Sequence, residues 1–221
     1  MAIDPLPALA RRARSALFVA TAATSALSAQ CPLAWASEPP ITGSVYTLLA
    51  EPDGGLVVGG SMTSIGSVPC AGLARRSPAG VWSAVDPGPL QLVTALEHAA
   101  NGDLLAAGTM PTPNGVRHGL VRSHAGATTV VAVADNNGSI LDLAVLTDGS
   151  IAVCGGGMME GVQLRTVARF DGVTWASMGL QMDHNTYAIA PLPNGGLLAG
   201  GRRGWDSTLT SNVSRWDGTA W

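Results

Sequence analysis

The chain repeats one short phrase four times at a nearly constant interval. The phrase is an Asx-Gly dipeptide followed by an apolar run that ends in glycine, always seven residues after the Asx. The Asx residues are Asp53, Asn101, Asp148 and Asn194, so the intervals from 53 to 101, 148 and 194 are 48, 47 and 46 residues. A period of this length is typical of arrays of identical supersecondary units. It favours several copies of one small motif over a single irregular domain.

Each copy contains four runs of strand-like composition. The first runs are 45–50, 92–98, 141–146 and 187–191, and the second runs are 56–60, 104–108, 151–155 and 197–201. The third runs are 72–75, 120–122, 166–170 and 213–216, and the fourth runs open at Trp82, Thr128, Trp175 and Trp221. Asx-Gly tolerates positive φ and forms tight hairpin turns, so it predicts an antiparallel meander. Glycine at the end of a strand indicates a bulge or the close approach of another backbone.

A four-stranded antiparallel sheet cannot bury both of its faces alone. Sheets stacked radially bury them against neighbours, whereas a two-layer sandwich would not require a constant period. A large aromatic at one position per sheet suits the wedge between blades. We therefore predict an all-β propeller, partial or minimal, with about four four-stranded antiparallel blades. The expected units are a signal peptide at 1–30, a segment with a lone closing strand at 31–44, and repeats at 45–91, 92–138, 139–185 and 186–221, the last incomplete.

A family resemblance rests on the repeat itself. The Gly-Gly pairs and the run Ala-Arg-Phe-Asp-Gly-Val-Thr-Trp at 168–175 resemble secreted kelch-like β-propeller repeats of the galactose-oxidase-type superfamily. The tyrosine that kelch repeats carry between the glycines and the tryptophan is missing. The resemblance implies a propeller and carries over no copper ligand, because the two tyrosines, Tyr46 and Tyr187, occupy first-strand positions where packing is expected.

The two ends of the repeat array leave two interpretations open. Trp35-Ala36-Ser37 resembles the start of a fourth strand, as in Trp82-Ser83-Ala84. Residues 33–37 either close a minimal four-bladed ring, or the chain is a fragment of a longer one.

The first thirty residues have the pattern of a secretory signal. Arg11, Arg12 and Arg14 precede an uncharged, alanine-rich stretch at 15–29 with small residues at its end. The stretch is too short to span a bilayer permanently, so we expect no transmembrane protein. The predicted location is secreted, periplasmic or cell-surface.

Composition excludes several classes of function. Only 12% of the residues are charged and the net charge is −3, so no basic field exists for nucleic acid. The twelve basic residues are all arginine, which excludes lysine chemistry. Three cysteines, Cys31, Cys70 and Cys154, form no CxxC pair, and Cys154 replaces the first glycine of a pair and should be small and buried. A Cys31–Cys70 disulfide stays an open alternative.

The chain carries no motif for catalysis. There is no Gly-x-Ser-x-Gly elbow, and His98, His118, His124 and His184 lack metal-binding spacings, so we expect no catalytic residue, metal or cofactor. Arg75, Arg122, Arg169 and Arg215 recur with the repeat, which predicts one structural contact per blade.

We expect the functional residues to lie in the loops between second and third strands, at 61–69, 110–118, 158–164 and 202–212. Trp205 is the one loop tryptophan outside the repeat and the predicted binding residue. The sequence favours an exported, non-catalytic scaffold that binds a protein or glycan through its loops. The alternative is an extracellular polysaccharide-active enzyme, a lyase or oxidase, with a site in the central channel.

Overall fold

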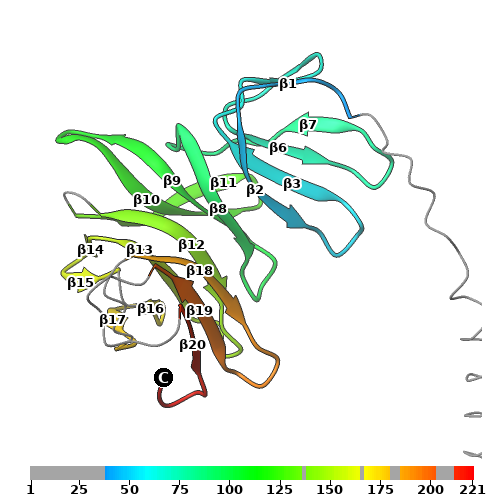
Figure 1. Cartoon of the computed structure of the whole chain (residues 1–221). Helices are drawn as coiled ribbons and strands as arrows, with labels where there is room; N and C mark the ends of the chain where they lie inside the picture. The colour runs from blue at the N-terminus through cyan, green and yellow to red at the C-terminus, as the bar shows by residue number, and fades with distance from the viewer. Residues whose placement is uncertain (1–37, 136–137, 165–166, 180–184, 203–211) are drawn as a thin grey trace, which may run out of the picture. The chain divides into compact units, whose positions relative to one another are not determined.

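The computed structural model describes residues 38–135, 138–164, 167–179, 185–202 and 212–221. The chain divides into two units, 1–38 and 39–221, and only the second lies substantially within the described residues. Within these ranges every regular element is a β-strand (Figure 1). No helix among them has the length and apolar character needed to cross a membrane.

Four antiparallel sheets follow one another along the chain. Blade 1 contains β2 (Val45–Ala50), β3 (Leu56–Gly60), β6 (Leu73–Arg76) and β7 (Trp82–Ala84). Blade 2 contains β8 (Leu92–His98), β9 (Leu104–Thr112), β10 (Gly115–His124) and β11 (Ala127–Val133). Blade 3 contains β12 (Ser139–Val145), β13 (Ile151–Gly156), β16 (Ala168–Phe170) and β17 (Trp175–Ser177). Blade 4, within the described ranges, contains β18 (Thr186–Pro191), β19 (Leu197–Gly201) and β20 (Val213–Trp216). The predicted all-β propeller of antiparallel blades is confirmed.

The glycine seven residues after each Asx lies opposite a bulge in the first strand. The pairing of the two strands skips one first-strand residue in every blade, and the skipped residues are Tyr46, Thr94, Leu141 and Tyr187. The bulged backbone passes so close that a Cβ on Gly108 would lie 1.7 Å from the carbonyl oxygen of Leu92. Both structural readings of these glycines, a bulge and a close backbone, are therefore confirmed.

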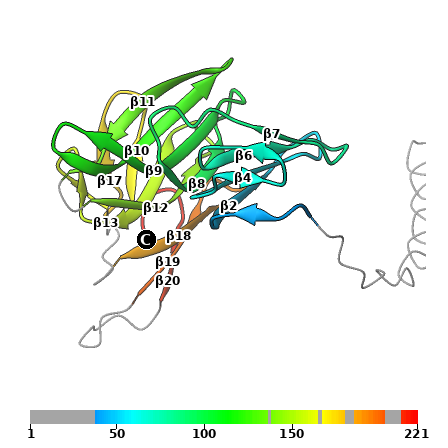
Figure 2. The same cartoon turned by 90° about the horizontal axis from the view of Figure 1, so that it is seen from above.

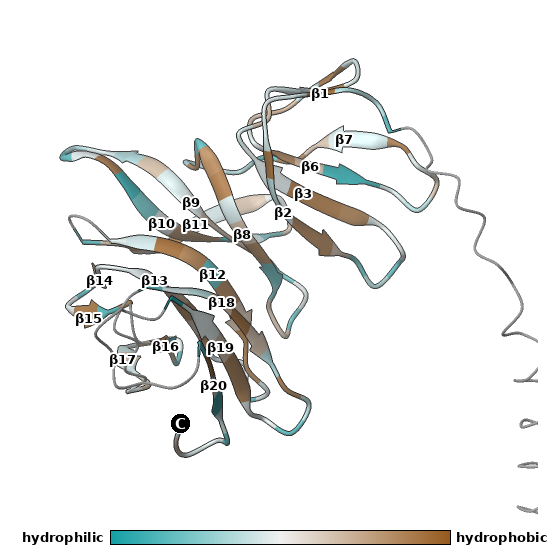
Figure 3. Ribbon diagram, in the orientation of Figure 1, coloured by the Kyte–Doolittle hydropathy of each residue, from teal (hydrophilic) through white to brown (hydrophobic). Residues whose placement is uncertain are grey.

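Three apolar clusters each combine residues from two neighbouring blades. They contain Val57 with Val93 for blades 1 and 2, Leu105 with Ile140 for blades 2 and 3, and Ala152 with Ile189 for blades 3 and 4. Figure 3 shows such apolar segments as brown stretches of β3, β8 and β12. Burying one large aliphatic side chain stabilises the fold by about 1.5–3 kcal/mol. The blades thus shield one another, as the repeat predicted.

The tryptophans that open the fourth strands have two kinds of surroundings. Trp175 packs on the cluster between blades 2 and 3, and Trp221 packs on the cluster between blades 3 and 4. The expected role as an interblade filler is confirmed for both. Trp82 instead packs on Met62 and Ile65, within blade 1 and its own hairpin.

Strands occur in three of the four segments predicted to be variable loops, and residues 203–211 of the fourth lie outside the described residues. The prediction of a variable loop at 110–118 is wrong, because β9 and β10 continue as one antiparallel ladder through Thr112 and Gly115. Figure 2 shows the labels of β9 and β10 beside one another, on neighbouring strands of blade 2. The small strand β4 (Ser64–Ile65) pairs on one side with β1 (Ile41–Thr42) and on the other with β5 (Val68–Pro69), and β14 (Met158–Met159) pairs with β15 (Val162–Gln163). We call the ends of the blades that carry these hairpins the loop end, and the opposite ends, with the Asx-Gly turns, the turn end.

Two expectations about aromatic residues have different outcomes. Tyr46 and Tyr187 do not pack into the interior, because they are 58% and 50% exposed on their bulges. A bulged residue lies outside the regular alternation of the strand, so its side chain need not follow the buried face. The predicted closing strand at Trp35 lies outside the described residues.

Candidate functional site

Three of the four recurring arginines, Arg75, Arg122 and Arg169, bind carboxylates of their own blades at the turn end. Arg75 pairs with Glu51 and, at 3.2 Å, with Asp53. Arg169 pairs with Asp148, the Asx of its turn. These intrablade contacts agree with the predicted structural role for Arg75 and Arg169. The fourth arginine, Arg215, is exposed, and its blade carries an uncharged Asn-Gly-Gly turn at 194–196.

In blade 2 the carboxylate that binds the recurring arginine lies two residues after the Asx of the turn. Asp103 accepts hydrogen bonds from His124 Nδ1 at 2.5 Å, Asn101 Nδ2 at 2.9 Å and Arg122 Nε at 2.6 Å. These donors, His124 first, lower the pKa of Asp103 to about 2. The carboxylate is therefore ionised at any physiological pH and is committed to its own turn.

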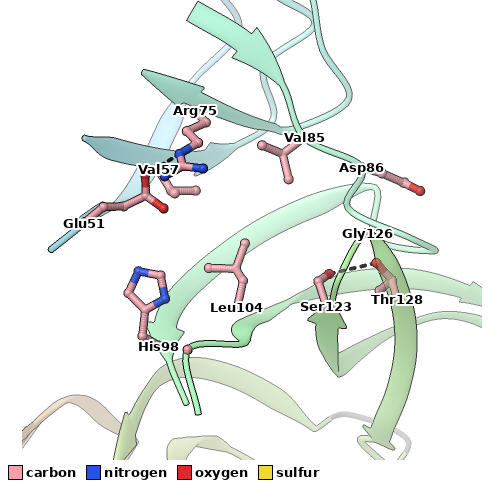
Figure 4. Close-up of a pocket in the computed structure, with 11 residues that line it drawn as sticks. Glu51, Val57, Arg75, Val85, Asp86, His98, Leu104, Ser123, Gly126 and Thr128 are labelled. Atoms are coloured by element: carbon pink, nitrogen blue, oxygen red, sulfur yellow. Dashed lines mark hydrogen bonds and ion pairs between the residues drawn. The ribbon is translucent and has the colours of Figure 1, made fainter. Parts of the chain in front are cut away.

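A cavity of about 240 Å³ lies at the turn end between blades 1 and 2 (Figure 4). Figure 4 shows the His98 ring projecting into it below the Glu51–Arg75 pair, with Leu104 and Val57 as apolar walls. The volume falls below the range of about 300–1,000 Å³ that is typical of ligand pockets.

The polar groups of this cavity are mostly bonded to one another. Ser123 and Thr128 share a hydrogen bond of 2.8 Å, and Asp86 Oδ1 accepts from the Gly88 amide at 2.9 Å. The Nε2 atom of His98 is buried and has no partner within the described residues. Because the Ser123 hydroxyl is bonded to Thr128 rather than to a histidine, the cavity holds no nucleophile–base pair of the kind that acyl transfer requires.

A second cavity, of about 400 Å³, lies at the loop end. Its lining comes from the β9–β10 hairpin and from the connection between β11 and β12, and consists of Thr109, Asn114, Val116, Arg117, His118, Asp135 and Gly138. This volume lies within the ligand-pocket range. Most of the lining residues carry hydrogen-bonding side chains, and one of the seven, Val116, has a large apolar side chain.

Arg117 and His118 are the two basic groups of the loop-end cavity. The Nε atom of Arg117 is buried and has no acceptor among the residues that the structure describes. His118 Nδ1 accepts a hydrogen bond from the Ile140 amide at 3.2 Å. Burial lowers the pKa of His118, so the ring is neutral at pH 7. With Nδ1 acting as an acceptor, the proton of the neutral ring resides on Nε2, which can donate.

Asp135 is held in place from blade 3. Its Oδ2 atom accepts from the Gly161 amide at 3.1 Å, and its own amide donates to the Met158 carbonyl at 2.9 Å. Both contacts come from the β14–β15 hairpin. The cavity therefore presents a fixed carboxylate opposite the basic hairpin residues.

The sequence-predicted site residues have mixed outcomes. Trp205 and His184 lie outside the described residues. His98, His118 and His124 belong to three separate environments, and the described residues contain no group of three or more potential metal ligands. Cys154 is fully buried, as predicted, and burial raises the pKa of its thiol. Arg117 was missed, although it stands outside the 47-residue register of the structural arginines, and that departure was the available signal.

Comparison with known proteins supports the fold. No protein-family model and no curated protein sequence matches the chain. The extracellular domain assigned to a hybrid two-component system of B. thetaiotaomicron is 12% identical with a TM-score of 0.53, over 77% of this chain and 23% of that one. The extracellular domain assigned to a one-component system of the same organism is 14% identical with a TM-score of 0.50, over 71% and 20%. The chain thus spans about a fifth of the length of these propeller-like neighbours.

An enzyme structure shows a weaker likeness. Virginiamycin B lyase from Staphylococcus aureus is 13% identical with a TM-score of 0.43, over 79% of this chain and 70% of that one. A score of this size supports no conclusion about fold or activity.

Proposed function

We propose that this chain is a non-catalytic β-propeller that binds an extracellular ligand at its loop end. The loop-end cavity carries the proposal, because it joins a partnerless arginine, a neutral histidine and a fixed aspartate in a space of about 400 Å³. Such a concave polar site suits the hydroxyl groups of a glycan. A protein partner would need a flat surface of roughly 800 Å² with aromatic anchors.

Export is part of the same proposal. The basic residues before the apolar stretch at 15–29 support a signal peptide, and the two neighbours with TM-scores of 0.50 and 0.53 are extracellular domains. We infer four secreted, kelch-like repeats at 45–91, 92–138, 139–185 and 186–221, preceded by a signal at 1–30 and a segment at 31–44. Retention of a reporter fused to residues 1–30 inside the cell would contradict export.

Binding without turnover is the decisive test. The purified chain is applied to a glycan array, and each bound glycan is then incubated with the protein and analysed by mass spectrometry. We expect saturable binding to a subset of glycans, which are recovered unchanged. Cleaved or oxidised glycan would instead support the alternative, a polysaccharide lyase or oxidase. Failure to bind any glycan on the array would refute the proposed ligand class.

A further inference from the structure

We propose that the loop-end cavity recognises the carboxylate of an acidic sugar, a uronic acid unit, and that Arg117 is the group that binds it. This inference rests on the proposed function and names the ligand class of the same site. Its basis is the combination, in a single cavity, of a guanidinium whose Nε atom has no acceptor within the described residues with side chains that can bind hydroxyl groups.

The first step concerns the charge on Arg117. A guanidinium is always protonated and presents its donors in a planar fork that matches the two oxygens of a carboxylate. The buried Nε donor has no acceptor within the described residues, and leaving such a group unsatisfied is costly. The other arginines of the third strands, such as Arg75 and Arg169, already hold carboxylates of their own blades. Arg117 is therefore equipped to take its carboxylate from a ligand.

The second step concerns the rest of the lining. Asp135 uses Oδ2 for the Gly161 amide, which leaves Oδ1 to accept from a sugar hydroxyl. His118 Nε2 can donate, because its Nδ1 is occupied by the Ile140 amide. The side-chain amide of Asn114 supplies both a donor and an acceptor. Donors and acceptors in one small space fit adjacent hydroxyl groups, which act as both.

The third step excludes other anions. A fatty acid would need an apolar wall, and Val116 is the one large apolar side chain among the lining residues. A dianionic phosphate would meet Asp135 in the same cavity and a chain of net charge −3. Like charges in one site repel, so a monoanion is favoured. A carboxylate attached to a polyol meets each of these conditions.

The experiment uses the full chain and matched probes. The probes are galacturonate, glucuronate-containing and mannuronate oligomers, the methyl ester of the galacturonate oligomer, and 6-sulfated and neutral galactose oligomers. We expect at least one uronate oligomer to bind in calorimetry, and its methyl-esterified form to bind roughly tenfold more weakly or worse, since a charged hydrogen bond is lost. Arg117→Gln should weaken uronate binding by a similar factor.

Two controls separate recognition from folding. Arg215→Gln removes an exposed arginine on blade 4 and should leave binding unchanged. The circular dichroism spectrum and thermal midpoint of Arg117→Gln should match those of the parent chain. Glycan binding that prefers neutral or sulfated oligomers, or that survives Arg117→Gln, overturns the uronate assignment and leaves the proposed function intact. Binding to none of these oligomers also overturns the uronate assignment, and the glycan array then decides whether the proposed function stands.

Discussion

Asp103 shows how a structural contact survives a change in the residues that make it. In blades 1 and 3 the arginine of the third strand reaches the Asx of the turn, Asp53 or Asp148. In blade 2 the Asx is Asn101, and the carboxylate stands two residues later at Asp103. Asn101 then donates to that carboxylate instead of competing with it. The contact is kept because the turn brings both positions beside the same arginine, Arg122.

The lowered pKa of Asp103 makes this contact sensitive to acid. The folded carboxyl has a pKa of about 2, below the ordinary value of 3.8. Its stabilising effect is therefore complete above pH 3.8 and is lost as the pH falls through about 2, because the unfolded chain takes up the proton first. We expect the thermal midpoint of the parent chain to fall more steeply between pH 4 and pH 2 than that of Asp103→Asn. Equal slopes for the two proteins would contradict the assignment.

The bulge in each first strand determines which of the two paired glycines is indispensable. The second glycine faces a carbonyl of the first strand just before the bulge, at Gly108 and likewise at Gly155, where a Cβ would lie 1.8 Å from the Ser139 oxygen. The first position accepts a small side chain in two blades, where it is Ala107 in blade 2 and Cys154 in blade 3. The two positions of the Gly-Gly pattern are thus subject to different steric constraints.

Two alanine substitutions distinguish these constraints. Gly108→Ala forces backbone movement and should lower the free energy of unfolding by about 1–3 kcal/mol or more. Gly200→Ala is the matched control, because its Cβ would meet one atom only, the Ala188 oxygen at 3.9 Å. That variant should be neutral or stabilised by up to about 1 kcal/mol through the unfolded chain. Urea unfolding of both proteins measures the difference, and a Gly108→Ala variant as stable as the parent would refute the steric account.

Side-chain hydrogen bonds join neighbouring blades beyond their apolar contacts. Thr94 Oγ1 donates to the Ile140 carbonyl at 3.1 Å, which links blade 2 to blade 3. The Ile189 amide donates to Asp142 Oδ2 at 2.8 Å, which links blade 3 to blade 4. Burial raises the pKa of Asp142, and its two amide donors only partly offset that effect. Both bonds start from first strands, so they reinforce the contact between adjacent sheets.

Loss of these links should affect the cooperativity of unfolding. Asp142→Ala leaves the Ile189 amide without this acceptor and should cost about 1–3 kcal/mol. Thr94→Val removes a hydroxyl that donates to backbone carbonyl groups. Carbonyl groups tolerate a missing partner better than amides do, so this variant should cost less than Asp142→Ala. We expect Asp142→Ala to lower protection of blade 4 amides in hydrogen exchange before blades 1 and 2 are affected. Uniform loss of protection across all blades would show that this contact is not specific to the blade 3–4 interface.

Much of the fold was predictable because its signals are local. The strand β3, for example, begins and ends at the residues expected from the Asx-Gly turn at Asp53 and the glycine at Gly60. The hairpin through Thr112 was missed although Asn114-Gly115 is a hairpin signal, because this dipeptide falls outside the repeat period and follows two prolines. The exposure of Tyr46 was also missed, because its bulge arises from pairing with another strand.

The repeat by itself determined the four blade sheets, their antiparallel order and the structural role of three of the recurring arginines. Turns, strand period and glycine positions are each encoded within a few adjacent residues, so they can be read without coordinates. Only the tertiary structure decided where a ligand could bind. Arg117 and Asp135 line one cavity because a strand hairpin and an interblade connection meet there, and Gly161 from the next blade holds the carboxylate. Contacts of this kind depend on packing between sheets, which leaves no period in the sequence.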